Sequence, residues 1–291
     1  NRKFQECLEI KPDDSRALLN WAFALTKQAE IAKDVQKNSS IAITHWRDAF
    51  SKYERALVLR PTDWRALNAW ATALSSQAAR VTVAKEGISL YRAAIDKFDR
   101  ALKLLPLPHF HTLYNTGNAR LKLARLLLDD LRSSRTVKNE KSVATHRECS
   151  DLLSVGISRF QESLEIEGTN VDAMTNLAIA LATQARICVQ DYSIAPYLSI
   201  NERDRLYQAA YLVYQRAIHL VPTSIPIYYG WGNALFRHAL ARREGPNPDD
   251  RIALTTIFDA ASKYQAALVI SEKEEAFFSR DVFINFGNVL M

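Results

Sequence analysis

The stretch that decides the fold reads Ala49-Phe50-Ser51-Lys52-Tyr53-Glu54-Arg55-Ala56-Leu57-Val58-Leu59-Arg60-Pro61. Tyr53, Ala56 and Leu57 lie three and four residues apart, so they share one face of a helix, and Pro61 ends that helix. The same order of residues returns at 94–106 and 210–222, more weakly at 156–168 and 260–272, and in part at 4–12. This recurrence predicts a chain built from repeated helices.

A second helical motif follows each copy of the first. It reads Leu19-Asn20-Trp21-Ala22-Phe23-Ala24-Leu25 near the start, and comparable stretches lie at 68–74, 114–119, 175–181, 229–235 and 284–290. Its centre is a small residue, which a large residue precedes in most copies. A small residue lets a neighbouring helix come close, and the large one fills the space beside that contact. The two motifs together predict pairs of packed helices.

The turns between the pairs are short. In Arg60-Pro61-Thr62-Asp63 the proline ends one helix, and Thr62 or Asp63 can cap the next. Lys11-Pro12-Asp13-Asp14 and Val221-Pro222-Thr223-Ser224 follow the same logic. We therefore expect a single solenoid over 1–291, with the second helix of a partial repeat at 1–12, pairs at about 14–61, 63–106, 109–168, 170–222 and 224–272, and a partial repeat at 279–291. Since both ends fall inside repeats, we expect the chain to be a fragment of a longer protein.

These motifs resemble the tetratricopeptide repeat (TPR) family. The matching parts are the Gly/Ala-x-Ala core of the first helix and the Ala-x-x-x-aromatic-x-x-Ala-Leu-x-Leu-x-Pro pattern of the second, and the resemblance covers nearly the whole chain. It implies an all-α fold, a right-handed α-solenoid of antiparallel helix pairs. The chain departs from the family in length, because ordinary members repeat about every 34 residues. Here the second-helix aromatics are more widely spaced, at Phe4, Tyr53, Phe98, Phe160, Tyr214 and Tyr264.

The extra length falls within each pair, between its first and second helices. We expect both helices of a pair to be extended and to meet at a longer hairpin, because polar and apolar residues keep a helical spacing at 28–33. A loop without secondary structure is the alternative. It fits best at 132–141, 190–201 and 244–250.

The resemblance implies a scaffold or adaptor that binds other proteins. First helices of such repeats line a concave surface that holds a peptide or a partner helix. Carried onto this sequence, the groove candidates are Arg16, Phe23, Arg65, Asn68, Thr72, Tyr114, Asn118, Tyr229, Asn233 and Arg237. The alternative is that Phe23, Tyr114 and Tyr229 only pack against neighbouring helices. A chaperone-tail ligand is not expected, because the positions of the family's first clamp lysine hold Leu19, Asn68, Tyr114, Thr175, Tyr229 and Ile284.

Nucleic acid is the alternative partner. The stretch from Trp46 to Leu57 also resembles the half-a-tetratricopeptide motif of RNA-processing proteins. The net charge is +6, and basic residues gather in two stretches that could contact phosphates: Arg132, Arg135, Lys138, Lys141 and Arg147, and then Arg237, Arg242 and Arg243. The same basic hairpins could also meet anionic lipid at a membrane surface.

Catalytic signatures are absent from the sequence. It has no glycine-rich phosphate loop, HExxH motif or nucleophile elbow. Neither His109 with His111 nor His146 with Cys149 makes a zinc site, because two ligands are too few. We therefore expect no enzyme activity, no catalytic or metal-binding residues and no cofactor.

The cysteines and the lengths of the apolar runs indicate the cellular compartment in which we expect the protein. The three cysteines, Cys7, Cys149 and Cys188, are odd in number and their spacings match no zinc pattern, and a reducing intracellular compartment fits them best. No apolar run approaches the roughly 20 residues of a membrane span. Unpaired terminal helices would expose apolar faces, so association between copies of the chain is a further possibility.

Overall fold

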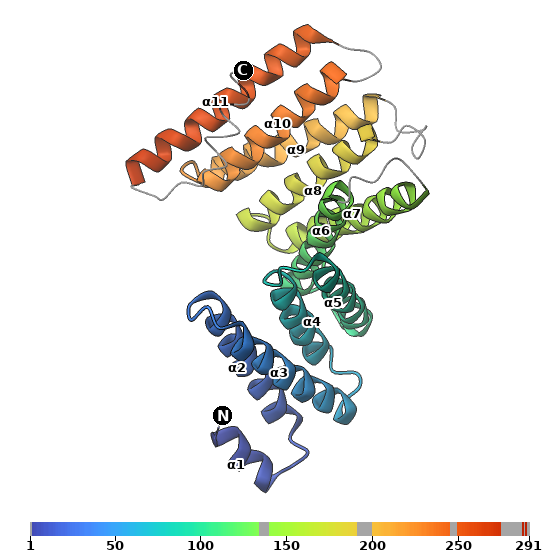
Figure 1. Ribbon diagram of the computed structural model, residues 1–291, viewed down its shortest axis with the longest axis vertical. Coiled ribbons are helices and arrows are strands. Elements are labelled where there is room, and N and C mark those ends of the chain that lie inside the picture. Colours follow the sequence, from blue (N-terminus) through green and yellow to red (C-terminus); the bar gives the residue numbers. More distant parts are fainter. Residues whose placement is uncertain are drawn as a thin grey trace. The chain divides into compact units, whose positions relative to one another are not determined.

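The computed structural model describes residues 2–133, 140–190, 200–244 and 249–274 and the single residues 287 and 289, and in this part of the chain all regular secondary structure is helical. The all-α prediction is therefore confirmed for the described residues. Figure 1 shows the helices in order: α1 (Arg2–Ile10), α2 (Ser15–Asp34), α3 (Ser39–Leu59), α4 (Trp64–Ala78), α5 (Ala84–Leu104), α6 (Phe110–Ser133), α7 (Glu140–Ile166), α8 (Val171–Gln190), α9 (Ile200–Leu220), α10 (Ile225–Glu244) and α11 (Asp250–Glu274).

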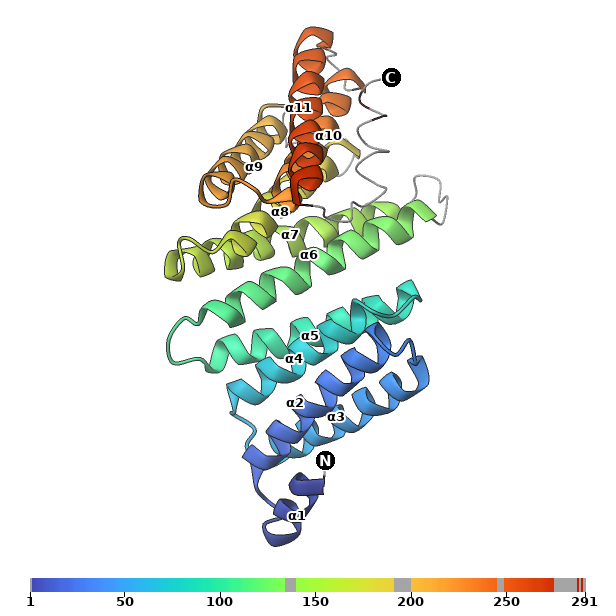
Figure 2. The ribbon, with the colours of Figure 1, turned by 90° about the vertical axis from the view of Figure 1, so that its left-hand side faces the viewer.

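The helices belong to two compact units, Asn1–Asp130 and Leu131–Met291. Unit 1 contains α1 to α5 and most of α6, and Figure 2 shows its helices following one another in chain order. The first helices of successive pairs also pack against each other. In unit 1 α2 packs against α4, and in unit 2 α8 packs against α10. This is the neighbour pattern of a helical repeat. That a single solenoid spans 1–291 stays a prediction. Among the described residues, no helix is long and apolar enough to cross a membrane.

The helices within each pair are lengthened, as the spacing of the motifs predicted. Helices α2 and α3 have 20 and 21 residues, and α6 and α7 have 24 and 27. In the second pair the extension is unequal, because α4 has 15 residues and α5 has 21. The β-branched run Val81-Thr82-Val83 follows α4, and such residues have low helix propensity. The loop alternatives at 132–141, 190–201 and 244–250 are helical at their described ends, and 134–139, 191–199 and 245–248 lie outside the described residues.

The core combines small residues on one helix with aromatic residues on its neighbour. Ala22 of α2 packs with Ala49 and Tyr53 of α3, all fully or almost fully buried. At Gly232 of α10 an added Cβ atom would lie 2.7 Å from the Tyr264 ring of α11, closer than any side chain tolerates. The small residues of the second motif therefore permit the close approach that the sequence predicted.

A tryptophan–lysine contact joins the first and second helices in several pairs. The Nζ atoms of Lys52 and Lys97 lie 4.6 and 4.3 Å from the ring centroids of Trp21 and Trp70. In unit 2, Lys263 lies 4.3 Å from Trp231 in the same way. Cation–π contacts of this kind contribute about 0.5–1 kcal/mol each. The corresponding positions of the fourth pair hold Leu177 and Val213, so both partners change together.

The predicted helix caps are present at two turns of unit 1. The Asp14 carboxylate accepts hydrogen bonds from the backbone N–H groups of Arg16 and Ala17, each at 3.0 Å. Asp63 accepts from Arg65 and Ala66 at 3.0 and 3.3 Å. These bonds satisfy amide groups that a helix leaves unpaired at its start. They set where α2 and α4 begin, and so where their side chains point.

Candidate functional site

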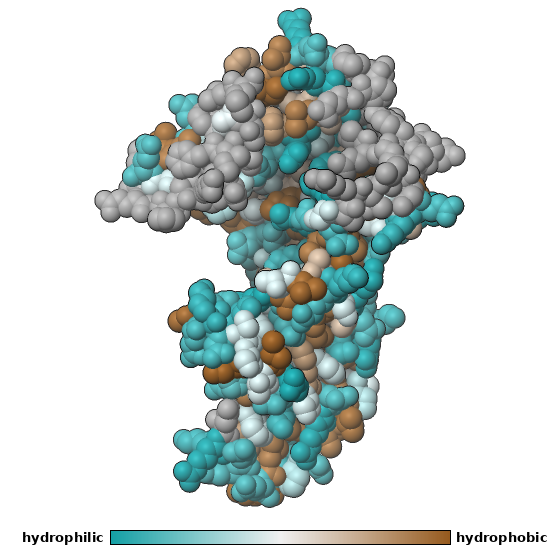
Figure 3. Space-filling model, in the orientation of Figure 1, coloured by the Kyte–Doolittle hydropathy of each residue, from teal (hydrophilic) through white to brown (hydrophobic). Residues whose placement is uncertain are grey.

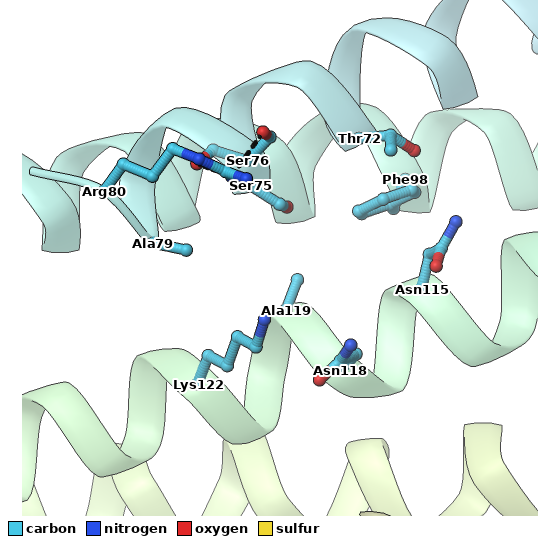
Figure 4. A pocket seen from close by; sticks show the side chains of 10 residues that line it. All are labelled: Thr72, Ser75, Ser76, Ala79, Arg80, Phe98, Asn115, Asn118, Ala119 and Lys122. Carbon is cyan, nitrogen blue, oxygen red and sulfur yellow. Dashed lines mark hydrogen bonds between the residues drawn. The ribbon is translucent and has the colours of Figure 1, made fainter. Parts of the chain in front are cut away.

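A pocket opens between α4 and α6 in unit 1. Its volume is about 180 Å³. Figure 4 shows side chains from the two helices facing each other across it, with Phe98 of α5 between them. The lining residues are Thr72, Ser75, Ser76, Ala79, Arg80, Phe98, Asn115, Asn118, Ala119 and Lys122.

The helical repeat explains how these side chains come together. Asn115, Asn118 and Lys122 are three and four residues apart, so they lie along one face of α6. Opposite them, Ser75 and Ser76 stand near the end of α4, and Arg80 follows that helix. Both helices are first helices of successive pairs, so the pocket lies on the side of the repeat predicted to bind a partner.

One wall of the pocket is held in place by α2. The Nη2 atom of Arg80 lies 2.7 Å from Oδ2 of Asp34, and its Nη1 donates to Oγ of Ser76 at 2.8 Å. The Ser76 hydroxyl donates in turn to Glu30 Oε1 at 2.6 Å. The hydrogen bond from Arg80 holds the pKa of Asp34 below its ordinary value. Asp34 and Ser76 therefore hold the Arg80 side chain in place, and the Asp34 carboxylate compensates most of its charge.

The opposite wall carries polar groups without protein partners. Within the described residues, the side chains of Asn115, Asn118 and Lys122 make no hydrogen bond or ion pair, and the buried Ser75 Oγ has no hydrogen-bond partner. Lys122 as a residue is exposed, yet desolvation of its ammonium group, followed by the charges of Arg80 and Arg125, lowers its pKa. The pocket thus offers an unneutralised cation, two amides and a hydroxyl to a ligand.

The predicted groove residues of unit 1 fall on α2, α4 and α6. Thr72 and Asn118 line the pocket together. Tyr114 is half-buried and stacks on Phe110 of the same helix, with ring centroids 5.8 Å apart. Phe23 is 56% exposed, and Lys27 of the same helix lies over its ring.

The three remaining candidates of unit 1 lie outside the pocket lining. Arg16 and Arg65 are exposed, and the Arg65 guanidinium lies 4.6 Å from the Trp64 ring centroid. Asn68 is half-buried, and its Oδ1 atom is buried without a hydrogen-bond partner among the described residues.

The predicted residues of unit 2 lie on α10. Asn233 accepts a hydrogen bond from the Tyr264 hydroxyl at 2.8 Å, and the Tyr229 ring lies 6.0 Å from that of Tyr264. Arg237 is exposed. Tyr229 and Asn233 therefore make contacts within the helix pair, which the packing alternative anticipated for Tyr229 alone.

Sequence reasoning did not find Ser75, Arg80, Asn115 and Lys122. Lys122 lies one turn beyond Asn118 on the same face, so extending the groove stripe along the lengthened helix would have found it. Arg80 lies after the end of α4, where helical periodicity gives no guide.

A second polar cluster, defined by Arg203, Asp204, Tyr211, His238 and Arg242, joins α9 to α10 in unit 2. The Asp204 carboxylate lies 3.0 Å from His238 Nε2 and 3.1 Å from Arg203 Nε, and Arg242 contacts its other oxygen. The Tyr211 hydroxyl lies 2.9 Å from His238 Nδ1. A Tyr–His–Asp series of this kind has the connectivity of a proton relay.

Burial argues against a catalytic role for this cluster. His238 and Arg203 are each 4% exposed. Desolvation raises the pKa of the Tyr211 hydroxyl far above its ordinary value, so that hydroxyl stays protonated at neutral pH and is a poor nucleophile. The cluster is therefore a structural network. Arg242, one of the three arginines in the second basic stretch, pairs with Asp204 in this cluster, so its charge is less available to a phosphate.

The histidine, cysteine and acidic side chains of the described residues do not form a metal site. No group of three His, Cys, Asp or Glu side chains there could hold a metal ion. His111 lies in the first turn of α6, while His146 and Cys149 are both buried in α7.

Comparison with known proteins supports the fold. No protein-family model and no curated protein matches the sequence. Among solved structures, YrrB, described as a TPR protein with an unusual peptide-binding site, superposes with a TM-score of 0.52 at 14% identity, over 92% of this chain and 97% of its own. A double mutant of MamA RS-1 gives 0.48 at 14% identity, over 87% and 96%. The S. pombe nuclear import adaptor Nro1 gives 0.40 at 12% identity, over 94% and 99%.

At such identities the likeness establishes the fold alone, and it rests on the YrrB superposition. Together with the helix pairs and their neighbour pattern, it defines the class of protein. The chain has a tetratricopeptide-type fold, in a divergent form whose helices are lengthened within the repeats.

Proposed function

We propose that this protein is a non-catalytic adaptor that binds an extended segment of another protein across α2, α4 and α6 of unit 1. The observation that carries the proposal is the α4–α6 pocket, where Asn115, Asn118 and Lys122 stand without partners among the described residues. These side chains are not fully buried, so they are accessible to a ligand and can form hydrogen bonds with it.

The chemistry of the pocket favours a polypeptide. A side-chain amide donates and accepts at the same time, which matches a peptide backbone with its own N–H and C=O groups. The pocket, at about 180 Å³, is smaller than the roughly 300–1,000 Å³ of sites that enclose a whole small molecule. It therefore suits one anchoring side chain of a longer ligand. On α2, the exposed ring of Phe23 offers an apolar contact for a neighbouring residue of the same ligand.

The surface of unit 1 is consistent with polar recognition. On the face that Figure 3 shows, hydrophobic residues of unit 1 occur in small patches among hydrophilic ones. The TPR protein YrrB is described as having a peptide-binding site, so the fold can serve this purpose. Among the described residues Cys7 and Cys149 form no disulfide, which fits the reducing intracellular compartment that we expect, within a multiprotein assembly. Association of copies through the terminal helices stays a prediction.

Selection of peptides from a random 12-residue display library on the whole 291-residue chain tests the proposal. We expect the chain to enrich peptides whose affinity, measured by fluorescence polarisation, falls about tenfold in Asn118→Ala, because a lost hydrogen bond of about 1–1.5 kcal/mol corresponds to that factor. The matched control is Asn201→Ala, which changes an exposed asparagine of α9 and should bind as tightly as the parent.

Two outcomes would reject the adaptor function. One is that no peptide is enriched. The other is that the enriched peptides bind Asn118→Ala and the parent equally. If no peptide is enriched but labelled single-stranded RNA binds at about 50 mM salt, the RNA-binding alternative replaces the proposal.

A further inference from the structure

We infer that the outer face of α11 in unit 2 is a self-association surface, on which α11 of a second copy of the chain packs antiparallel. The inference goes beyond the proposed adaptor function, because it concerns a different helix and a different partner. The surface, which we call the α11 stripe, is defined by Arg251, Leu254, Phe258, Ser262, Gln265, Val269 and Glu272.

The α11 stripe lies on a face of the helix that α10 does not cover. Ala253, Ala260, Tyr264 and Ala267 form the buried face toward α10, which Figure 1 shows along one side of α11. The stripe is centred about 130° away from that face, since successive residues of a helix are about 100° apart. All seven of its residues are exposed, over a length of about 32 Å at 1.5 Å per residue.

The stripe is apolar at positions where it could be polar. Phe258 is 72% exposed, Leu254 is 55% exposed and Val269 is 43% exposed. Phe258 stands six residues before the motif aromatic Tyr264, and the other second helices have polar residues at the same place: Arg47 in α3, Arg92 in α5, Ser154 in α7 and Gln208 in α9. Covering such apolar side chains is favourable, so a phenylalanine at this position indicates a partner.

The order of residues along the stripe is self-complementary. The stripe begins with a cation, Arg251, and ends with an anion, Glu272, and neither has an ion pair in the part of the chain that the structure describes. When two identical helices pack antiparallel, residues at equal distances on either side of the centre lie opposite each other, and each pair occurs twice. The opposite pairs are Arg251 with Glu272, Leu254 with Val269, and Phe258 with Gln265.

The spacing of the stripe also suits a second helix. Its members follow at intervals of three or four residues that average about 3.5, the interval that keeps a seam between two packed helices. Ser262, a small residue near the centre, lets the two backbones approach. A lipid surface fits less well, because anionic lipid would repel Glu272. These features favour a second copy of α11 as the occupant.

Sedimentation velocity on the whole 291-residue chain tests the inference. We expect a species of 33.0 kDa at about 1 µM and one of twice that mass at about 500 µM, because a contact between two helices is small and binds modestly. Phe258→Arg should raise the dissociation constant of the dimer about a hundredfold, since each dimer loses two central aromatic contacts. The matched control is Gln208→Arg, at the corresponding exposed position of α9, which should leave the dissociation constant unchanged. Circular dichroism verifies that each variant is folded.

An exchange of charges tests the antiparallel arrangement. Arg251→Glu and Glu272→Arg should each weaken self-association about fivefold, because like charges then meet at both ends of the stripe. The variant with both substitutions should associate as the parent does. An equimolar mixture of the two single variants should do the same, because the charges of one copy then complement those of the other.

Each contrary outcome overturns a stated part of the inference. A parent that stays monomeric at the higher concentration overturns self-association, and so does equal association of the parent and Phe258→Arg. Recovery in neither the double variant nor the mixture overturns the antiparallel arrangement. If the parent stays monomeric but binds vesicles of phosphatidylserine and phosphatidylcholine, and Phe258→Arg does not, the stripe is reassigned to a lipid surface. Peptide binding by unit 1 is measured separately, so failure of the adaptor function is distinguishable from each of these results.

Discussion

The α4–α6 pocket of unit 1 and the α9–α10 cluster of unit 2 both contain charged and polar side chains, but these are paired to different degrees. In the cluster, Asp204 is contacted by Arg203, His238 and Arg242, so its charge is compensated within the fold. In the pocket, Lys122 has no ion pair among the described residues. Residue type alone therefore does not mark a binding site. What marks it is a set of polar groups that the rest of the fold leaves unsatisfied.

The two regions also differ in the helices that form them. The cluster joins a second helix to the first helix that follows it, with a buried residue on each, Arg203 on α9 and His238 on α10. The pocket lies between two first helices, with the second helix α5 supplying Phe98 between them. In this pocket, Asn115, Asn118 and Lys122 of the first helix α6 make no hydrogen bond or ion pair among the described residues, so they are available to a ligand.

The largest expected effect on stability comes from removing the Asp204 charge at the centre of the α9–α10 cluster. Asp204→Asn leaves the buried Arg203 without its counter-ion, and breaking a buried ion pair costs about 3–5 kcal/mol. We expect a loss of about 3 kcal/mol in the free energy of unfolding. This is the lower end of that range, because Arg242, the other arginine that contacts Asp204, is partly exposed and water can solvate its charge. Urea unfolding measures the loss. Asp151→Asn, at an exposed position of α7, should change stability by less than about 0.5 kcal/mol.

A smaller effect should appear as a pH dependence of the same cluster. Desolvation, only partly offset by Asp204, lowers the pKa of His238 below its ordinary value of 6.5. The unfolded chain therefore binds a proton more readily than the folded one. The stabilisation is complete above about pH 6.5 and is lost as the pH falls through the pKa of the folded state.

Urea unfolding at pH 7 and pH 5 measures this dependence. His238→Gln should reduce the difference in stability between the two pH values, whereas His111→Gln, at an exposed histidine of α6, should leave it unchanged. An equal difference in His238→Gln and the parent would show that His238 does not sense pH.

The smallest effect on stability is expected from a substitution in the α4–α6 pocket. Ser75→Ala removes a buried hydroxyl that has no partner among the described residues, so the free energy of unfolding should change by less than about 0.5 kcal/mol. Affinity for the selected peptides should still fall. A loss of stability comparable to that of Asp204→Asn would mean that the pocket is a structural network as well, and the contrast between the two regions would disappear.

Particular residues show how far the sequence could be interpreted. The caps at Asp14 and Asp63 were predictable, because each depends on neighbours that are close in sequence. The small residue at Gly232 was predictable because the motif repeats, although the ring that it accommodates belongs to Tyr264 on another helix. Thr72 and Asn118 were groove candidates implied by the family resemblance, and both line the pocket. Arg80 was not predictable, because its role depends on Asp34, which lies 46 residues away on another helix.

The sequence by itself determined the helical repeat and the helix pairs, because these follow from short-range spacing and from local propensities. The face that carries the candidate groove was implied by the family resemblance and stays a prediction. Only the tertiary structure decided which polar side chains are paired and which are left open. Whether a charge is neutralised depends on atoms brought within about 3 Å from distant parts of the chain, as Asp34 is to Arg80 and Asp204 to His238. Helical periodicity carries no information about those distances.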